Sequence, residues 1–202
     1  MTVRKGVGWG LRRVVPVEAP LVPGDAALHD WVATHRLQRR PIGDVAIGGG
    51  DLARTLAGAT RTGAEATYVP LDVVRLVADD EHTTWSASHV VARRSWWRGE
   101  VLLAMNTEFL GAYDVAPRAH PNDGLVDVIE VAAEMPWRAR MQARDRARRG
   151  AHLPHPQLTA IRVPAFTATF ARPLVVWVDG ERWRQATRLE LTVEPDAYSA
   201  YL

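Results

Sequence analysis

An apolar run of seven residues, Leu125 to Val131, constrains the fold more than any other stretch of this 202-residue sequence. Five of its positions hold Val, Ile or Leu, a composition that favours a mostly buried strand. The preceding Asn122-Asp123-Gly124 is a turn signal, because these residue types bend a chain at low cost. A loop, a turn and a buried strand are therefore expected in succession between residues 106 and 131.

Strand-like segments also dominate the end of the sequence. They are Leu158 to Val163, Ala165 to Phe170, Leu174 to Val178, Leu189 to Val193 and Tyr198 to Leu202. Asp179-Gly180 follows one of them and is typical of a two-residue hairpin turn. Residues 68–78, 85–94 and 100–106 add three further strand candidates upstream. The second part of the chain is thus predicted to be rich in β-structure.

Two longer helices are expected. One covers residues 25–38, where Asp25 can cap the start and Leu28 and Val32 share a face. The other runs from Pro136 to Arg149, with proline in its first turn and Gly150 just past its end. Arginine covers much of this second helix, which suits either a solvated face or contact with an anionic bilayer.

Glycine follows a short apolar strand near residue 47. Gly48, Gly49 and Gly50 precede Asp51, which begins a short predicted helix. A strand–glycine–helix junction directs backbone N–H groups at one point, an arrangement that suits a phosphate. A tight turn without a ligand explains the same pattern equally well.

Composition narrows the class of protein. The chain has no cysteine, which excludes disulfides, thiolate metal sites and a cysteine nucleophile. It has no apolar run of about 18 residues, so no membrane span is expected. No apolar segment follows the first residues, so we expect no secretory signal and a cytoplasmic location. Of the 25 basic residues only Lys5 is a lysine. This bias reflects either genome composition or a surface for phosphate and anionic lipid.

Tryptophan and arginine also meet at Trp96-Trp97-Arg98. Such a group can stack on bases, lie at a membrane interface, or pack on a sheet edge. All three interpretations stay open at the level of sequence.

Two motifs in this order resemble the bacterial diacylglycerol kinase and lipid kinase family, which is related in fold to sphingosine kinases and NAD kinases. The first is Ala116-Pro117-x-Ala119-x-x-x-Asp123-Gly124-Leu125-x-Asp127-Val128, and the second is Val178-Asp179-Gly180-Glu181. Gly48 to Leu56 looks like a shortened form of the family's Gly-Thr-Gly-Asn-Asp-x-Ala-Arg-x-Leu segment, without its Asn. The resemblance implies an α+β fold. A reduced α/β segment, residues 1–80, would precede an antiparallel β-sandwich-like domain, residues 81–202.

The resemblance also implies ATP-dependent phosphorylation of a lipid hydroxyl, with Mg²⁺ and ATP as cofactors. Phosphoryl transfer needs phosphates held in line and a carboxylate that accepts the hydroxyl proton. Glu181 and Asp179 would be the catalytic residues, with Glu181 as the proton acceptor. Gly48, Gly49, Gly50, Asp51 and Asp72 would serve the nucleotide. Asp123 would join a structural Mg²⁺ site, to which His120 and Leu125 would contribute backbone carbonyls.

The sequence departs from the family in one important respect. The family's Gly-Gly-Asp-Gly-Thr motif, which receives nucleotide phosphates, does not occur in these 202 residues. Three hypotheses follow: a minimal or partner-completed lipid kinase, a non-catalytic module that binds lipid or nucleotide, and a nucleic-acid binder. A lipid substrate or an anionic membrane surface is the expected partner, and the protein could lie at the membrane periphery. A homo-oligomer stays open, and nucleic acid is the least favoured partner.

Overall fold

The computed structural model describes residues 9–202. Its helices are α1 (Asp25–Leu37), α2 (Gly50–Thr55) and α3 (Trp137–Ala147). The early strands are β1 (Leu11–Val14), β2 (Leu21–Val22), β3 (Asp44–Ile47), β4 (Glu65–Ala78), β5 (His82–Ser86), β6 (His89–Arg93) and β7 (Val101–Met105). The later strands are β8 (Phe109–Leu110), β9 (Tyr113–Asp114), β10 (Val126–Val131), β11 (Leu158–Val163), β12 (Ala165–Val178) and β13 (Glu181–Tyr201).

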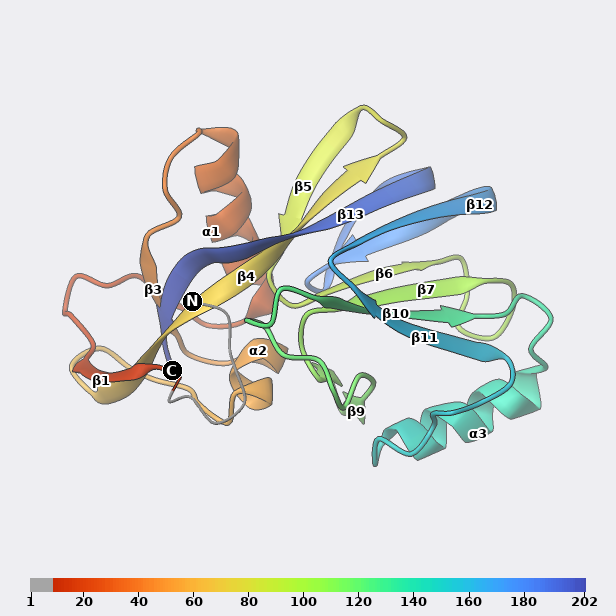
Figure 1. The fold of residues 1–202 in the computed structure, drawn as a ribbon, viewed down its shortest axis with the longest axis horizontal. Coiled ribbons are helices and arrows are strands. Elements are labelled where there is room, and N and C mark those ends of the chain that lie inside the picture. The colour runs from red at the N-terminus through yellow and green to blue at the C-terminus, as the bar shows by residue number, and fades with distance from the viewer. Residues whose placement is uncertain (1–8) are drawn as a thin grey trace.

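One large sheet of 11 strands organises the described chain. Its main path is β1-β4-β13-β12-β6-β7-β10-β11, and every pair along this path is antiparallel. β5 extends β4, while β3 joins the end of β13 in parallel and carries β2 on its other side. Figure 1 shows β13 as a long strand that runs from beside β3 and α1 to the side of the molecule where it lies next to β12.

The sheet curls so that its two halves share a core. Val74 and Leu189, from β4 and β13, belong to the same buried cluster as Val90 and Val128, from β6 and β10. Alternation along these strands turns one apolar set inward. The result is a sandwich-like body, which confirms the predicted antiparallel β-sandwich-like domain in an α+β fold.

The two short N-terminal helices cover the other end of the sheet. Leu28 and Val32 of α1 are fully buried and pack with Leu52 of α2 and Val45 of β3. The predicted helix over residues 25–38 is thus confirmed. Pro70 does not interrupt β4, because the strand continues through it and pairs Pro70 with Ser199.

The boundary expected at residue 80 falls at the turn between β4 and β5. Since those two strands pair with each other, one sheet includes chain from both sides of that boundary. The division into residues 1–80 and 81–202 stays a prediction.

One expected strand is split. Residues 85–94 were predicted to form a single strand, but β5 ends at Ser86 and β6 begins at His89. Between these strands, the backbone N–H groups point inward and donate to a carboxylate instead of to a neighbouring strand. That carboxylate is the centre of the site described next.

Candidate functional site

Asp179 lies at the centre of a buried hydrogen-bond network. Its Oδ1 accepts from the Ser86 hydroxyl at 2.7 Å and from the Ser88 and His89 N–H groups at 2.9 and 2.8 Å. Its Oδ2 accepts from the Ala87 N–H at 2.8 Å. Charged acceptors make the stronger hydrogen bonds in proteins. Both oxygens are thus used to hold residues 86–89, which makes Asp179 a positioning residue.

The turn at Asp179-Gly180 has the predicted geometry. Asp179 has φ 50° and Gly180 has φ 91°, the positive values that a primed two-residue hairpin turn requires. Glu181 follows at the start of β13 and is exposed. No atom lies within 4 Å of where a Cβ on Gly180 would be, so the tip of the hairpin faces open space.

The glycine loop before α2 is joined to the same network by Asp25. Asp25 accepts from the Asp51 N–H at 2.6 Å and the Leu52 N–H at 3.2 Å. It also accepts from the Ser88 hydroxyl at 2.5 Å. The N-cap residues of α1 and α2 make no side-chain capping hydrogen bond. Asp25 was expected to cap α1, but its carboxylate caps α2.

This cap changes the chemistry expected at the glycine loop. Two N–H groups that a phosphate could have met are taken by the Asp25 carboxylate. The Gly48 N–H donates to the Val22 carbonyl at 2.8 Å. A nucleotide phosphate at Gly48, Gly49 or Gly50 would therefore approach two carboxylates, Asp25 and Asp51. The nucleotide assignment of this loop stays a prediction.

Asp51 also reaches the β8–β9 hairpin and a histidine. It accepts from the Gly111 N–H at 2.9 Å, and its Oδ2 lies 3.8 Å from Nδ1 of His89. Within residues 9–202 this buried nitrogen has no hydrogen-bond partner. Burial raises the pKa of Asp51, the Gly111 N–H opposes that rise, and Asp25 adds to it.

Asp72 organises a second cluster. Its carboxylate accepts from the Gly124 and Asp196 N–H groups, each at 2.8 Å, and from the Asn122 amide at 3.2 Å. Burial raises the pKa of Asp72, and the two N–H groups oppose the rise. Asp72 therefore fixes the Asn122–Gly124 turn directly and does not contact Asp51 through any of these bonds.

Asn106 connects the two clusters. Its Nδ2 donates to the Ala87 carbonyl at 2.8 Å and to the Asp72 carbonyl at 3.3 Å. Ala87 is in turn held by Asp179. Three predicted motifs, around Asp51, Asp123 and Asp179, thus meet through one continuous set of polar contacts.

Asp123 itself is paired with an arginine. The Arg162 guanidinium contacts Asp123 and donates from Nε to Asp127 at 3.1 Å. The other Asp123 oxygen accepts from the Leu125 N–H at 3.0 Å. Among residues 9–202 no three His, Cys, Asp or Glu side chains are grouped to hold a metal ion. A cation at Asp123 would therefore have to compete with the Arg162 guanidinium for this carboxylate.

His120 is assigned to the metal through its backbone carbonyl, and its side chain makes other contacts. Its Nδ1 accepts from the Asn122 N–H at 3.2 Å, and its ring packs edge-on against Trp9 at 4.9 Å between centroids. Burial lowers the pKa of His120, which favours the neutral ring. The metal assignment of His120, Asp123 and Leu125 stays a prediction.

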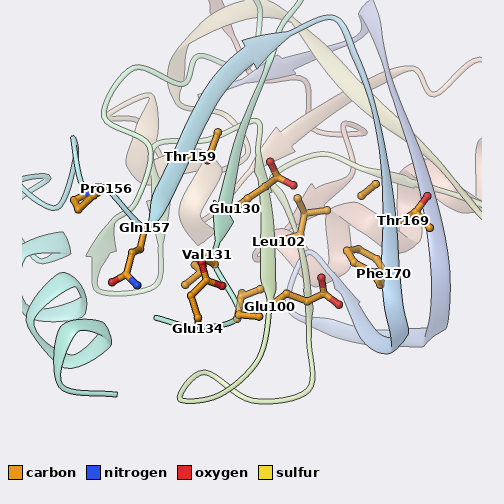
Figure 2. A pocket seen from close by; sticks show the side chains of 14 residues that line it. Glu100, Leu102, Glu130, Val131, Glu134, Pro156, Gln157, Thr159, Thr169 and Phe170 are labelled. Atoms are coloured by element: carbon orange, nitrogen blue, oxygen red, sulfur yellow. The ribbon is translucent and has the colours of Figure 1, made fainter. Parts of the chain in front are cut away.

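A separate pocket of about 400 Å³ opens between β10 and β12. Figure 2 shows Glu100, Glu130 and Glu134 at its walls, with Phe170 across from them. None of the predicted site residues lines it. This pocket therefore lies apart from the residues assigned to the nucleotide.

Sequence reasoning missed the segment that joins the motifs, Ser86 to His89, and the role of Asp25. One signal was present. Ser86, Ser88 and His89 place three polar residues inside an apolar stretch that runs from Trp85 to Val91, and a buried polar run needs partners.

Comparison with known proteins places this geometry in a family. The model of the YegS C-terminal NAD kinase beta sandwich-like domain matches residues 53–200. A search of curated proteins returned no match.

Three solved structures from Bacillus anthracis str. Sterne have the same fold. One, described as "a putative diacylglycerol kinase", has a TM-score of 0.66 at 14% identity, over 89% of this chain and 74% of that chain. A second with the same description has a TM-score of 0.58 at 13% identity, over 78% and 68% of the two chains. A third, described as a diacylglycerol kinase, has a TM-score of 0.55 at 12% identity, over 79% and 67%. At these identities the likeness concerns the fold alone.

The family match covers the motifs at Ala116–Val128 and Val178–Glu181, and only the end, residues 53–56, of the Gly48–Leu56 segment. It confirms the resemblance to lipid kinases that these motifs indicated. The chain belongs to the family of the YegS C-terminal NAD kinase beta sandwich-like domain.

Proposed function

We propose that this protein is a lipid kinase-like phosphotransferase that moves the terminal phosphate of MgATP to a lipid hydroxyl such as that of diacylglycerol. The observation that supports it most is the polar network joining the Asp51 loop to the Asp179 hairpin. Family membership supports the class of reaction. The lipid, the nucleotide and the transfer itself are part of the proposal.

Glu181 has the access that a proton acceptor requires. It lies at an exposed hairpin tip whose other side is fixed by the buried Asp179. A carboxylate on a rigid support can accept the hydroxyl proton as the oxygen attacks the phosphorus. In this proposal Asp179 holds the hairpin, and Glu181 touches the substrate.

The loop around Asp51 is the proposed nucleotide side. The Asp25 and Asp51 carboxylates would repel a bare phosphate, whereas the Mg²⁺ of the substrate MgATP would neutralise that repulsion. The unpartnered Nδ1 of buried His89 lies beside Asp51 and offers a hydrogen-bonding group to a polar part of the substrate.

Transfer of labelled phosphate tests the proposal. The full chain, labelled ATP, Mg²⁺ and vesicles containing diacylglycerol should yield labelled phosphatidic acid. Glu181→Gln should reduce the rate by about 10²-fold or more, because a general base is worth that much. Glu65→Gln, the same change at an exposed residue of β4, should retain the rate. The proposal fails if wild-type protein yields no labelled lipid, or if both variants keep full activity.

A second candidate function is a non-catalytic module that binds lipid or nucleotide. The missing Gly-Gly-Asp-Gly-Thr motif and the missing Asn before Asp51 favour it. It predicts a thermal shift with MgATP or diacylglycerol in wild-type protein that shows no phosphate transfer. Turnover that depends on Glu181 would exclude it.

A further inference from the structure

An aromatic face lies around α3, apart from the site described above. Trp96 and Trp97, on the loop between β6 and β7, are each 39% exposed, while Trp137 and Met141 of α3 are 55% and 50% exposed. Trp97, Trp137 and Met141 line one groove of about 620 Å³. A cluster of exposed large apolar side chains on one surface marks an interaction site.

Arg140 makes this face rigid. Its guanidinium is buried, with the residue 5% exposed, and its donors bind backbone oxygens from the two segments that border the groove. The acceptors include the Gly99 carbonyl at 2.5 Å, the Ala132 carbonyl at 2.8 Å and the Met135 carbonyl at 2.9 Å. The face is therefore held in place before any partner arrives, which lowers the entropic cost of docking.

Positive charge lies on the same surface. Trp137, Met141, Arg144 and Arg148 follow helical spacing along one stripe of α3. The Arg144 guanidinium is 5.6 Å from the Trp97 ring centroid, and its Nε donates to the Tyr113 hydroxyl at 2.6 Å. Residues 134–149 contain six arginines against two acidic residues.

This combination selects the partner. Tryptophan lies at the level of the lipid headgroups, where its ring is apolar and its N–H is polar. Arginine forks bind the phosphates of anionic lipids. No helix within residues 9–202 is long and apolar enough to cross a bilayer.

We propose that Trp97, Arg98, Trp137, Met141, Arg144 and Arg148, the Trp–Arg face, dock this protein onto an anionic lipid bilayer. The face connects to the candidate site through the β8–β9 hairpin, because Tyr113 contacts Arg144 and Gly111 contacts Asp51. Docking does not depend on phosphate transfer, so the two proposals can fail separately.

Vesicle sedimentation tests this face. Full-length protein should pellet with phosphatidylcholine vesicles that contain phosphatidylglycerol and stay in solution with phosphatidylcholine alone. Arg98→Gln with Arg148→Gln should weaken binding about 25-fold, since each arginine near the surface is worth about fivefold. Trp97→Ser with Trp137→Ser should weaken it at least about tenfold.

Arg39→Gln with Arg61→Gln is the matched control, because it removes the same charge from exposed positions in the N-terminal half. Figure 1 shows the α1–β3 loop, which includes Arg39, at the opposite end of the molecule from α3. Glu181→Gln should pellet like wild type. The inference is wrong if the control pair loses as much vesicle binding as the face pair, or if binding does not depend on phosphatidylglycerol. It is also wrong if vesicles are not bound and the face variants instead lose binding to a DNA or RNA oligonucleotide.

Discussion

Arg162 supplies a positive charge beside Asp123. Its guanidinium contacts Asp123 and Asp127 together, and the register between β10 and β11 places Asp127 opposite Arg162. An internal arginine is present at any ion concentration, whereas a bound Mg²⁺ is not. Stability at this turn should thus be independent of Mg²⁺.

The melting temperature in millimolar Mg²⁺ should equal that in EDTA for wild-type protein. Arg162→Ala removes the guanidinium from two carboxylates, and burial already raises the pKa of Asp127. We expect that variant to lose about 2 kcal/mol, as a half-buried ion pair is broken, and to regain part of it with Mg²⁺. If the melting temperature of the wild-type protein rises by several degrees with Mg²⁺, this prediction is wrong and the result supports a Mg²⁺ site.

The buried His152 side chain predicts the direction in which stability changes with pH. Burial lowers its pKa below the ordinary value of 6.5, although the nearby Val115 backbone and the Asp114 carboxylate oppose the shift. A depressed histidine pKa means that the folded state favours the neutral ring. Its contribution to stability is therefore present above pH 6.5 and lost as the pH falls through the folded pKa.

Denaturant unfolding from about pH 7 to about pH 5 measures this contribution. The free energy of unfolding should fall less steeply with acid in His152→Gln than in wild type. His120, whose pKa is also lowered by burial, should keep part of the slope in the variant. Identical slopes in the two proteins would contradict the assignment.

At the scale of elements, the start of α2 depends on a carboxylate from α1. Gly50 has φ +96°, and a Cβ there would lie 2.5 Å from Oδ2 of Asp25, the oxygen that caps α2. Gly43 has φ +75°, and a Cβ there would meet nothing within 4 Å. Both glycines therefore need a positive φ, but only at Gly50 would an added Cβ clash with a neighbouring atom.

Gly50→Ala should therefore destabilise the protein more than Gly43→Ala. Both variants lose about 1–2 kcal/mol from the left-handed backbone, and Gly50→Ala also displaces the cap, for about 1–2 kcal/mol more. Chemical denaturation of both proteins compares them directly. Equal losses would show that Asp25 does not cap α2 in solution.

Local patterns predicted most of the elements. The Asp179-Gly180 hairpin, the helix at residue 25 and the strand at residue 126 each have a signal within a few residues of chain. The break between β5 and β6 has no such local cause, because the N–H groups of residues 87–89 donate to Asp179, 90 to 92 residues away. The cap on α2 likewise comes from 26 residues upstream. Contacts of this kind depend on the sheet topology, which periodicity does not specify.

At the scale of the molecule, the site joins segments from both ends of the sequence. Residue types and spacings in the sequence indicated the motif residues Asp51, Asp72, Asp123 and Asp179. They did not indicate that one hydrogen-bond network would connect these residues. Asn106 and Ser88, which carry the links, are small polar residues with no motif of their own. The sequence also could not show that Arg162 pairs with Asp123, since that contact requires β11 to lie beside β10.

The network predicts energetic coupling between its distant members. Ser88 donates its hydroxyl to Asp25 and its N–H to Asp179, so the two carboxylates act on one residue. Side chains that share a partner in a buried network are not additive when changed together.

A double-mutant cycle on the free energy of unfolding, with Asp25→Asn and Asp179→Asn, tests this coupling most directly. We expect the loss of stability in the double variant to depart from the sum of the losses in the single variants by about 1 kcal/mol or more. Asp25→Asn with Asp80→Asn, an exposed aspartate on the β4–β5 turn, should add within about 0.5 kcal/mol. Additivity of both pairs would contradict the claim that one network holds the candidate site together.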